Sequence, residues 1–354
     1  MARGAASRTR ARSLLRWPVV RRDPRQAQAP GRVTILGEHT DYNRGRSIGV
    51  ATEQRTVVVV EDGAPGTVEV VSSSCGTAST SVAHPSGEAF VVLAASLARA
   101  AGVDGVRLTA DGDLPVGAGL SSSASYAVAV ALALGIEGTP LDVARACQAA
   151  ERATGSDVGL LDQLVILSAH TGSFVDLDFA GPVVDVLDLH AAIGLSVVDS
   201  GERRLVATSA YAARRAECAA AAAVIGPLGL ARLADLDRLA DPVLARRARH
   251  VVSECTRVDA ARDALRAGDL GWLGRLLDEG HASLRDDFDA STPSVEAARA
   301  ELATLPGVVG VRLTGAGFGG CLLVAHDPDA DVVPPGRWGS RLTGGAGASV
   351  SGAR

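Results

Sequence analysis

The order of strand and helix patterns in this chain of 354 residues predicts an α+β fold with two domains. Short apolar segments typical of strands dominate residues 31–201, and Ala/Arg/Leu-rich helical patterns follow from about residue 207 to 290. Residues 307–326 then return to a strand, a glycine loop and a strand. The change in composition near 195–205 marks a boundary, so we assign residues 29–200 and 201–333 to the two domains.

The elements follow from the periodicity of their apolar residues. Helical spacing occurs in the first domain at 87–102 and 141–155, and between them a glycine loop leads into an apolar helix that ends near residue 135. In the second domain, Pro293 just inside residues 291–302 indicates the start of a helix. Strands are expected at 31–37, 55–62, 67–74, 105–115 (with its loop), 172–179 and 193–201.

Composition indicates a globular protein, with 47% hydrophobic and 21% charged residues. The net charge of −5 gives no reason to expect nucleic acid as a partner, and no apolar run approaches the roughly 18 residues of a membrane helix. Five cysteines without a CxxC pair fit reduced thiols. We therefore expect a cytoplasmic protein, a monomer without membrane contacts.

The chain contains no lysine, so all 35 basic residues are arginine. This absence excludes a Walker A loop, a protein kinase and a pyridoxal phosphate enzyme, because each requires a lysine. If the protein binds phosphates, it must use backbone N–H groups, helix N-termini, arginine and a metal ion. A GC-rich genome would also favour arginine over lysine.

The two ends of the chain differ in composition from the rest. Residues 1–28 hold eight arginines and a single acid, Asp23, which predicts either a disordered arm or a start codon assigned too early. Residues 334–354 are rich in Gly and Ser, which predicts a flexible tail.

The segment GAGLSSSAS, residues 117–125, places two glycines and three serines at the start of the apolar helix. Glycines let a backbone approach a ligand closely, and a helix N-terminus attracts an anion such as phosphate. A serine hydroxyl there can also reach a phosphate-bound Mg²⁺. The alternative is an ordinary loop whose serines cap the helix.

Two further polar groups stand out, each with a structural alternative. The turn GEHTDYN places Glu38, His39 and Asp41 together, where they could bind a metal or the hydroxyls of a sugar, or could form a polar surface turn. Asp162 lies in the apolar run GLLDQLVIL, where it is either a reactive carboxylate or an aspartate in the first turn of a helix. Glu151 lies between the serine loop and Asp162 in the sequence.

Three motifs in this order resemble the GHMP kinase superfamily, and within it the galactokinase family. PGRVTILGEHTDYNRG (30–45) is similar to the galactokinase signature, LPVGAGLSSSAS (114–125) to the phosphate-binding motif, and LTGAGFGGC (313–321) to the third motif. The resemblance covers about residues 29–326. It implies a two-domain GHMP kinase fold, with an N-terminal ribosomal-protein-S5-like domain and a C-terminal ferredoxin-like domain.

The resemblance also implies roles for individual residues. Asp162 would be the catalytic base and Arg32 its partner, while Ser123 and Glu151 would hold Mg²⁺. The sugar would contact Glu38, His39, Thr40, Asp41, Gly159 and Tyr211. The ATP phosphates would contact Gly117, Ala118, Gly119, Leu120, Ser121, Ser122 and Ser123.

The activity implied by the family is ATP-dependent phosphorylation of the anomeric hydroxyl of α-D-galactose, which gives galactose 1-phosphate and ADP. Two alternatives remain open at this point. The segment GRSIGVA lacks the proline that usually follows the first motif, so another sugar, N-acetylgalactosamine or arabinose, is one alternative. The other is a sensor that binds galactose and ATP without turnover.

Overall fold

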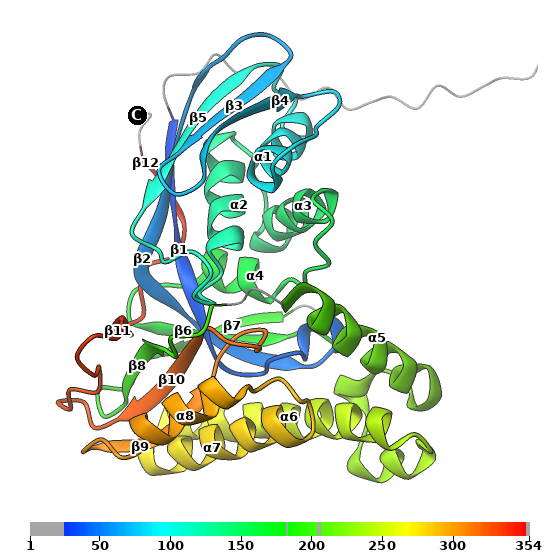
Figure 1. Ribbon diagram of the computed structural model, residues 1–354, viewed down its shortest axis with the longest axis vertical. Coiled ribbons are helices and arrows are strands. Elements are labelled where there is room, and N and C mark those ends of the chain that lie inside the picture. Colours follow the sequence, from blue (N-terminus) through cyan, green and yellow to red (C-terminus); the bar gives the residue numbers. More distant parts are fainter. Residues whose placement is uncertain (1–24, 182, 204–206, 352–354) are drawn as a thin grey trace, which may run out of the picture.

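The computed structural model describes residues 25–181, 183–203 and 207–351, which form two β-sheets with helices packed against them (Figure 1). This arrangement confirms the predicted α+β class. The first sheet and its helices occupy one half of the molecule, and the second sheet with the longest helices occupies the other (Figure 1).

Within the described residues the first sheet has eight strands, in the order β12-β1-β2-β5-β3-β4, with β6 and β7 joined at the first part of β2. Only β3 and β5 run parallel among these neighbours. The strands are β1 (Arg25–Leu36), β2 (Arg46–Asp62), β3 (Thr67–Ser72), β4 (Gly76–Ser81), β5 (Val106–Gly112), β6 (Ser173–Asp178), β7 (Val183–Asp188) and β12 (Ser349–Ser351).

Four helices lie on one side of this sheet: α1 (Ala89–Ala100), α2 (Ser122–Ala133), α3 (Pro140–Ala153) and α4 (Leu161–Ser168) (Figure 1). Helix α2 is central and packs on β1 and β2 as well as on its neighbouring helices. Its small side chains, such as the fully buried Ala127 and Ala131, let it approach the sheet closely. Thr139 and Asp142 form a capping box that starts α3.

The second sheet has the order β11-β8-β10-β9 and is entirely antiparallel. Helix α6 begins at the cap Asp241 and ends at Gly268, whose φ of 66° suits glycine. The elements are β8 (Gly194–Asp199), β9 (Val308–Leu313), β10 (Cys321–His326), β11 (Gly339–Arg341), α5 (Ala207–Ile225), α6 (Pro242–Ala267), α7 (Leu270–Asp286) and α8 (Pro293–Leu302), with short 3₁₀ turns η1 (Asp41–Asn43), η2 (Leu228–Leu230) and η3 (Leu233–Arg238).

A shared hydrophobic core joins the two halves. Leu36 of β1 and Ile48 of β2 belong to the same buried cluster as Leu195 of β8, Val258 of α6 and Leu277 of α7. All of these side chains are at most 1% exposed. The two halves are therefore held together by a continuous apolar interior and are not joined only by a flexible linker.

The predicted flexible tail is wrong for much of residues 334–351. β11 pairs with β8, and β12 pairs with β1, so the end of the described chain adds a strand to each sheet. Glycines at 344, 345 and 347 allow the backbone between these strands to bond to Gly172, Ala51 and Ala169 at 2.7–3.1 Å. The glycines that suggest disorder from composition instead allow the backbone to pack closely here.

The predicted arm and boundary also differ in part. Residues 1–24 of the arm lie outside the described residues, but residues 25–28 already belong to β1 and pair with β2 and β12. Strand β8 precedes the predicted boundary after residue 200, yet it lies in the second sheet. Among the described helices, none is long and apolar enough to cross a membrane.

We expect Leu342→Ala to destabilise the protein, because Leu342 is 3% exposed in the shared core. The free energy of unfolding should fall by about 2–5 kcal/mol, as for other buried leucines, and urea denaturation measures it. Val350→Ala is the control, since Val350 is 50% exposed and its loss should cost less than about 0.5 kcal/mol. Equal, small effects would show that this segment is as loosely held as its composition suggests.

Candidate active site

Asp162 and Arg32 form an ion pair where α4 meets β1. Asp162 lies in the first turn of α4, and its Oδ1 accepts a hydrogen bond from Arg32 Nε at 2.7 Å and lies 2.7 Å from Nη2 of the same guanidinium. The Arg32 side chain is 6% exposed and that of Asp162 is 32% exposed, so the carboxylate remains accessible from the cavity it lines. Asp162 is thus both a first-turn aspartate and a paired, accessible carboxylate.

The glycine-serine loop before α2 wraps around the same arginine. Arg32 donates from Nη1 to the carbonyl of Gly119 at 2.9 Å and from its backbone N–H to that of Leu120 at 3.1 Å. Gly117 and Gly119 have φ of 77° and 86°, values that favour glycine. Ser121 also has a left-handed φ of 59°, and α2 begins at the next residue.

Five of the seven predicted phosphate contacts line one cavity, namely Gly117, Gly119, Ser121, Ser122 and Ser123. Leu120 is 1% exposed and packs with Ala118 against the shared core, so these two side chains point away from it. Ser121 occupies the N-cap position of α2, but its hydroxyl makes no capping bond and donates to Asp162 Oδ2 instead. Helix capping therefore does not explain Ser121.

Glu151 lies near Ser123 at the end of α3 and is 4% exposed. Its Oε1 accepts from Gln163 at 2.8 Å. Burial raises the pKa of Glu151 to about 7, although hydrogen bonds from Gln163 and Ser123 oppose the shift. A buried carboxylate with a hydroxyl beside it suits a divalent cation bound through oxygen.

The turn Glu38–Asp41 presents three of its four predicted side chains to the cavity. Glu38, His39 and Asp41 line it. Thr40 does not, because it is fully buried and its hydroxyl donates to the carbonyls of Gly37 at 2.8 Å and Arg46 at 2.7 Å. The structure therefore places Thr40 inside the turn, where it stabilises the backbone.

Gly159 and Asp41 are in close contact across the cavity. A Cβ atom on Gly159 would lie 1.5 Å from Asp41 Oδ2, so no larger residue fits without moving this carboxylate. Burial and the nearby Asp162 raise the pKa of Asp41. Tyr211 of α5 lines the same cavity, and its hydroxyl contacts Arg215. The guanidinium carbon of Arg215 lies 4.4 Å from the centroid of the Tyr42 ring.

The ring of His39 is positioned by aromatic packing and by a contact with the Tyr42 hydroxyl. Its ring lies 4.3 Å from that of Phe288 and 5.7 Å from that of Tyr211, between centroids. His39 Nδ1 and the Tyr42 hydroxyl are 2.9 Å apart. Its φ of 64° bends the chain so that Glu38 and Asp41 both reach the cavity.

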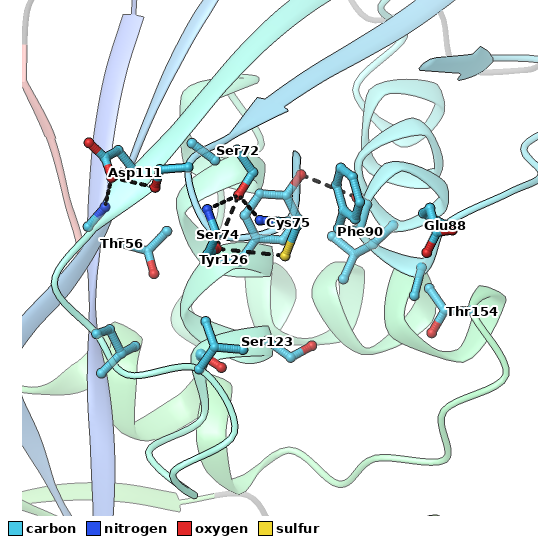
Figure 2. A pocket seen from close by; sticks show the side chains of 18 of the residues that line it. Thr56, Ser72, Ser74, Cys75, Glu88, Phe90, Asp111, Ser123, Tyr126 and Thr154 are labelled. Atoms are coloured by element: carbon cyan, nitrogen blue, oxygen red, sulfur yellow. Dashed lines mark hydrogen bonds between the residues drawn. The ribbon is translucent and has the colours of Figure 1, made fainter. Parts of the chain in front are cut away.

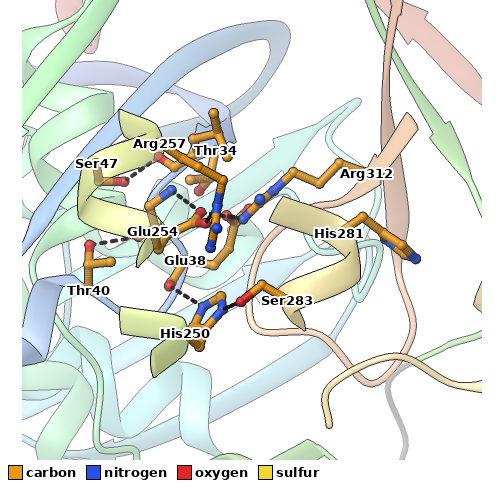
Figure 3. Close-up of polar contacts among 12 residues, drawn as sticks. Thr34, Glu38, Thr40, Ser47, His250, Glu254, Arg257, His281, Ser283 and Arg312 are labelled. Carbon is orange, nitrogen blue, oxygen red and sulfur yellow. Dashed lines mark hydrogen bonds and ion pairs between the residues drawn. The ribbon is translucent and has the colours of Figure 1, made fainter. Parts of the chain in front are cut away.

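Behind the turn lies a buried ionic cluster that connects it to the second domain (Figure 3). Arg312 of β9 donates to Glu38 and, at 2.6 Å, to Glu254 of α6. Arg257 donates to Glu254 at 2.8 Å, and the backbone N–H of Gly37 does so at 2.7 Å. These contacts fix the start of the turn.

Burial and the neighbouring arginines act in opposite directions on the pKa values of the two glutamates in the cluster. Burial raises the pKa of Glu38, although Arg312 opposes the shift. Burial would also raise the pKa of Glu254, but Arg312 and Arg257 outweigh it and hold that pKa well below its ordinary value. His250 lies beside the cluster, and burial lowers its pKa to about 3, so it is neutral at pH 7.

Two cavities meet at the glycine-serine loop. The first, of 510 Å³, contains the Arg32–Asp162 pair and the turn. The second, of 330 Å³, lies beside α1 and α2 and is lined by Phe90, Tyr126 and the 72–75 turn (Figure 2). Ser122 and Ser123 line both, so α2 begins at the junction of the two cavities.

Several residues of the site carry no signal in the sequence. Arg312 and Glu254 lie 58 positions apart and look like ordinary charges of a strand and a helix. The 72–75 turn, which has no recognisable motif, lines the second cavity.

Comparison with known proteins identifies the family. The galactokinase galactose-binding signature matches residues 20–62, and the GHMP kinases N terminal domain and C terminal models match 89–170 and 261–333. Galactokinase of Homo sapiens is 34% identical over 85% of this chain and 83% of its own length. Galactokinase of Mycobacterium tuberculosis is 36% identical over 86% of this chain and 90% of its own length. The chain belongs to the galactokinase family.

Solved structures support the same family and fold. Lactococcus lactis galactokinase complexed with galactose matches with a TM-score of 0.83 and 26% identity over 92% of this chain and 95% of its own. A mevalonate kinase matches with a TM-score of 0.62 and 13% identity over 90% of this chain and 98% of its own, which shows a shared fold. The predicted two-domain GHMP kinase fold is confirmed.

We expect Arg312→Met to destabilise this member of the galactokinase family strongly, because it leaves Glu38 and Glu254 buried without their shared partner. The loss should be about 3–5 kcal/mol in urea denaturation. The matched control is Arg285→Met, which removes an arginine from an exposed pair with Asp286 and should cost at most about 1 kcal/mol. A similar, small loss in both would contradict the importance of the cluster.

His250 provides a pH-dependent test. The pKa of the His250 imidazole falls from 6.5 in the unfolded chain to about 3 in the folded protein. Below pH 6.5 the unfolded chain therefore binds a proton at His250 that the folded protein does not bind. This proton binding stabilises the unfolded state, so the free energy of unfolding falls as the pH is lowered. His250→Gln cannot titrate and keeps polar atoms near Ser283. From pH 6.5 to 4.5, wild type should lose about 2 kcal/mol relative to the variant, with a slope that approaches about 1.4 kcal/mol per pH unit at the lower end. Parallel pH profiles of unfolding free energy would contradict a neutral, buried His250.

Proposed function

We propose that this chain transfers the γ-phosphoryl group of ATP to O1 of α-D-galactose, giving galactose 1-phosphate and ADP. The observation that carries the proposal is the Arg32–Asp162 pair, bonded to the glycine-serine loop and facing the cavity of the Glu38–Asp41 turn. A base between an anion-binding helix N-terminus and a sugar-sized cavity suits phosphoryl transfer to a hydroxyl. The likeness to a galactose complex supports the choice of sugar.

In this proposal the sugar occupies the 510 Å³ cavity. The carboxylates of Asp41 and Glu38 accept hydrogen bonds from its hydroxyls, and His39 and Tyr211 contribute polar atoms and ring surfaces. Gly159 leaves room for Asp41. Thr40 supports the turn without touching the sugar, since its hydroxyl is used by the backbone.

The nucleotide extends from the loop into the 330 Å³ cavity. The backbone N–H groups at the start of α2, near Ser122 and Ser123, bind the phosphates. This chain has no lysine, and backbone N–H groups can bind phosphates without one. The adenine base lies in the second cavity, where Phe90 and Tyr126 supply apolar ring surface. This places the γ-phosphate at the junction of the two cavities.

Ser123 and Glu151 would hold Mg²⁺ together with the phosphates. Their hydroxyl and carboxylate oxygens are ligands that Mg²⁺ prefers, and the exposed Ser123 lies beside the buried Glu151 at the loop. Among the described residues no group of three or more His, Cys, Asp or Glu side chains could hold a metal, so substrate phosphates would complete the shell. Bound Mg²⁺ would neutralise charge on the β- and γ-phosphates.

The reaction assigns one proton to Asp162. O1 of the sugar attacks the γ-phosphorus, its proton passes to Asp162, and the bond to the bridging oxygen of ADP breaks. Arg32 holds the carboxylate in place through an N–H bond from Nε and an ion-pair contact from Nη2, and it adds positive charge near the transferred group. Most of the catalysis is positioning, which a pre-bonded pair supplies.

Two further expectations belong to the proposal. We keep the cytoplasmic location as a prediction, supported by five free cysteines in the described residues, and we keep the monomer as a separate prediction. A kinase for N-acetylgalactosamine or arabinose and a non-catalytic sensor are the competing functions. The first would share the pair and the loop, while the second would bind without releasing ADP.

The deciding experiment is ADP release from MgATP with galactose, glucose, N-acetylgalactosamine and arabinose. We expect turnover with galactose, and a fall in kcat of about 10²- to 10⁴-fold in Asp162→Ala and Asp162→Asn, because both lose the base. Asp104→Asn, an exposed aspartate that lines neither cavity, is the control and should retain full activity.

Other outcomes separate the alternatives. Turnover with a different sugar, still lost in Asp162→Ala, would keep the mechanism and change the substrate. Galactose binding by calorimetry without ADP release in wild type would replace the kinase by a sensor.

A further inference from the structure

Ser121 is bonded to the base rather than to its own helix. It stands at the N-cap position of α2, yet its hydroxyl donates to Asp162 Oδ2 and makes no capping bond. A serine at this position would ordinarily donate or accept within the first turn. The sequence motif had placed it among the phosphate contacts.

The contacts of Asp162 leave one of its oxygens open to a substrate. A carboxylate has about four lone-pair positions, two on each oxygen. Arg32 donates from Nε to Oδ1 at 2.7 Å, and its Nη2 lies 2.7 Å from the same oxygen, while Ser121 donates to Oδ2. Two guanidinium nitrogens therefore crowd Oδ1, and an incoming hydroxyl reaches the lone pair of Oδ2 that Ser121 does not use.

The cavities distinguish Ser121 from the two serines after it. Ser122 and Ser123 line both the 510 Å³ and the 330 Å³ cavities, as expected for residues between a sugar and a nucleotide. Ser121 lines only the 510 Å³ cavity, on the side of Asp162. Its side chain is therefore directed away from the proposed nucleotide site.

We infer that Ser121 is a positioning residue for the catalytic base, which restricts proton transfer to one lone pair of Asp162 Oδ2, and that its side chain is not a phosphate ligand. The inference rests on the proposed function. In the step it supports, the O1 proton moves to that lone pair, O1 bonds to the γ-phosphorus and ADP leaves. The Ser121 hydroxyl keeps its own proton and stays on Oδ2.

The backbone of Ser121 offers a matched pair of variants. Its φ of 59° is unfavourable for alanine and natural for glycine. Ser121→Ala and Ser121→Gly both remove the hydroxyl, but only the glycine variant relieves the backbone. An effect of the hydroxyl is common to both, whereas an effect of backbone geometry separates them.

The experiment measures kcat and KM for ATP and galactose in wild type, both Ser121 variants and Ser122→Ala, with the thermal midpoint of each. We expect kcat to fall about 10- to 100-fold in both Ser121 variants, because a misplaced base loses alignment. KM for ATP should stay within about twofold. Ser121→Gly should be at least as stable as wild type while remaining slow.

Three results would overturn the inference. A rise in KM for ATP with unchanged kcat would make Ser121 a phosphate ligand. Near-normal kcat in Ser121→Gly together with a slow Ser121→Ala would assign the effect to the backbone. Wild-type kcat in both would remove any role for the hydroxyl. Wild type inactive with every sugar would instead overturn the proposed function, and this inference with it.

Discussion

The arrangement of the site depends on the guanidinium of Arg32. Its side chain joins β1 to α4 through Asp162 and to the loop before α2 through the carbonyl of Gly119, and its backbone N–H bonds the carbonyl of Leu120. Three segments that are distant in sequence therefore share one buried cation. Any shift of the glycine-serine loop would move Asp162 as well. In the proposed function, the phosphates and the base are therefore positioned by the same arginine.

The Glu38–Asp41 turn, which is the proposed sugar side of the cavity, is held by residues of the second domain. Arg312 and Glu254, both from the second domain, fix Glu38 and the N–H of Gly37 at the start of the turn (Figure 3). The shared hydrophobic core keeps the two domains together around this cluster. In the proposed function, the first domain thus supplies Asp162 and the glycine-serine loop, and the second domain orients the Glu38–Asp41 turn. This division explains why the cavity lies where the domains meet.

Local patterns predicted what lies within one segment of the chain. The α+β class, the helix after the serine loop and the accessible Asp162 follow from periodicity or from a motif that is contiguous in sequence. Contacts between distant segments were not predictable. From the sequence, the hydroxyl of Ser121 could equally have capped α2. The fold places Asp162 of α4 beside it, and the hydroxyl donates to that carboxylate instead. The same holds for Thr40, whose hydroxyl is used by its own turn, and for β12, whose pairing with β1 overrides a composition typical of loops.

The absence of lysine has a structural counterpart at Arg32. An ammonium group is a compact charge on a flexible stem, whereas guanidinium donors point in fixed directions within one plane. Arg32 uses that plane to donate from Nε to one oxygen of Asp162 and from Nη1 to Gly119, with Nη2 also 2.7 Å from the same Asp162 oxygen. A lysine could neutralise Asp162 but could not also hold the loop with the same geometry. In this chain arginine therefore contributes shape as well as charge, and in the proposed reaction that shape leaves the other oxygen of Asp162 to receive the proton.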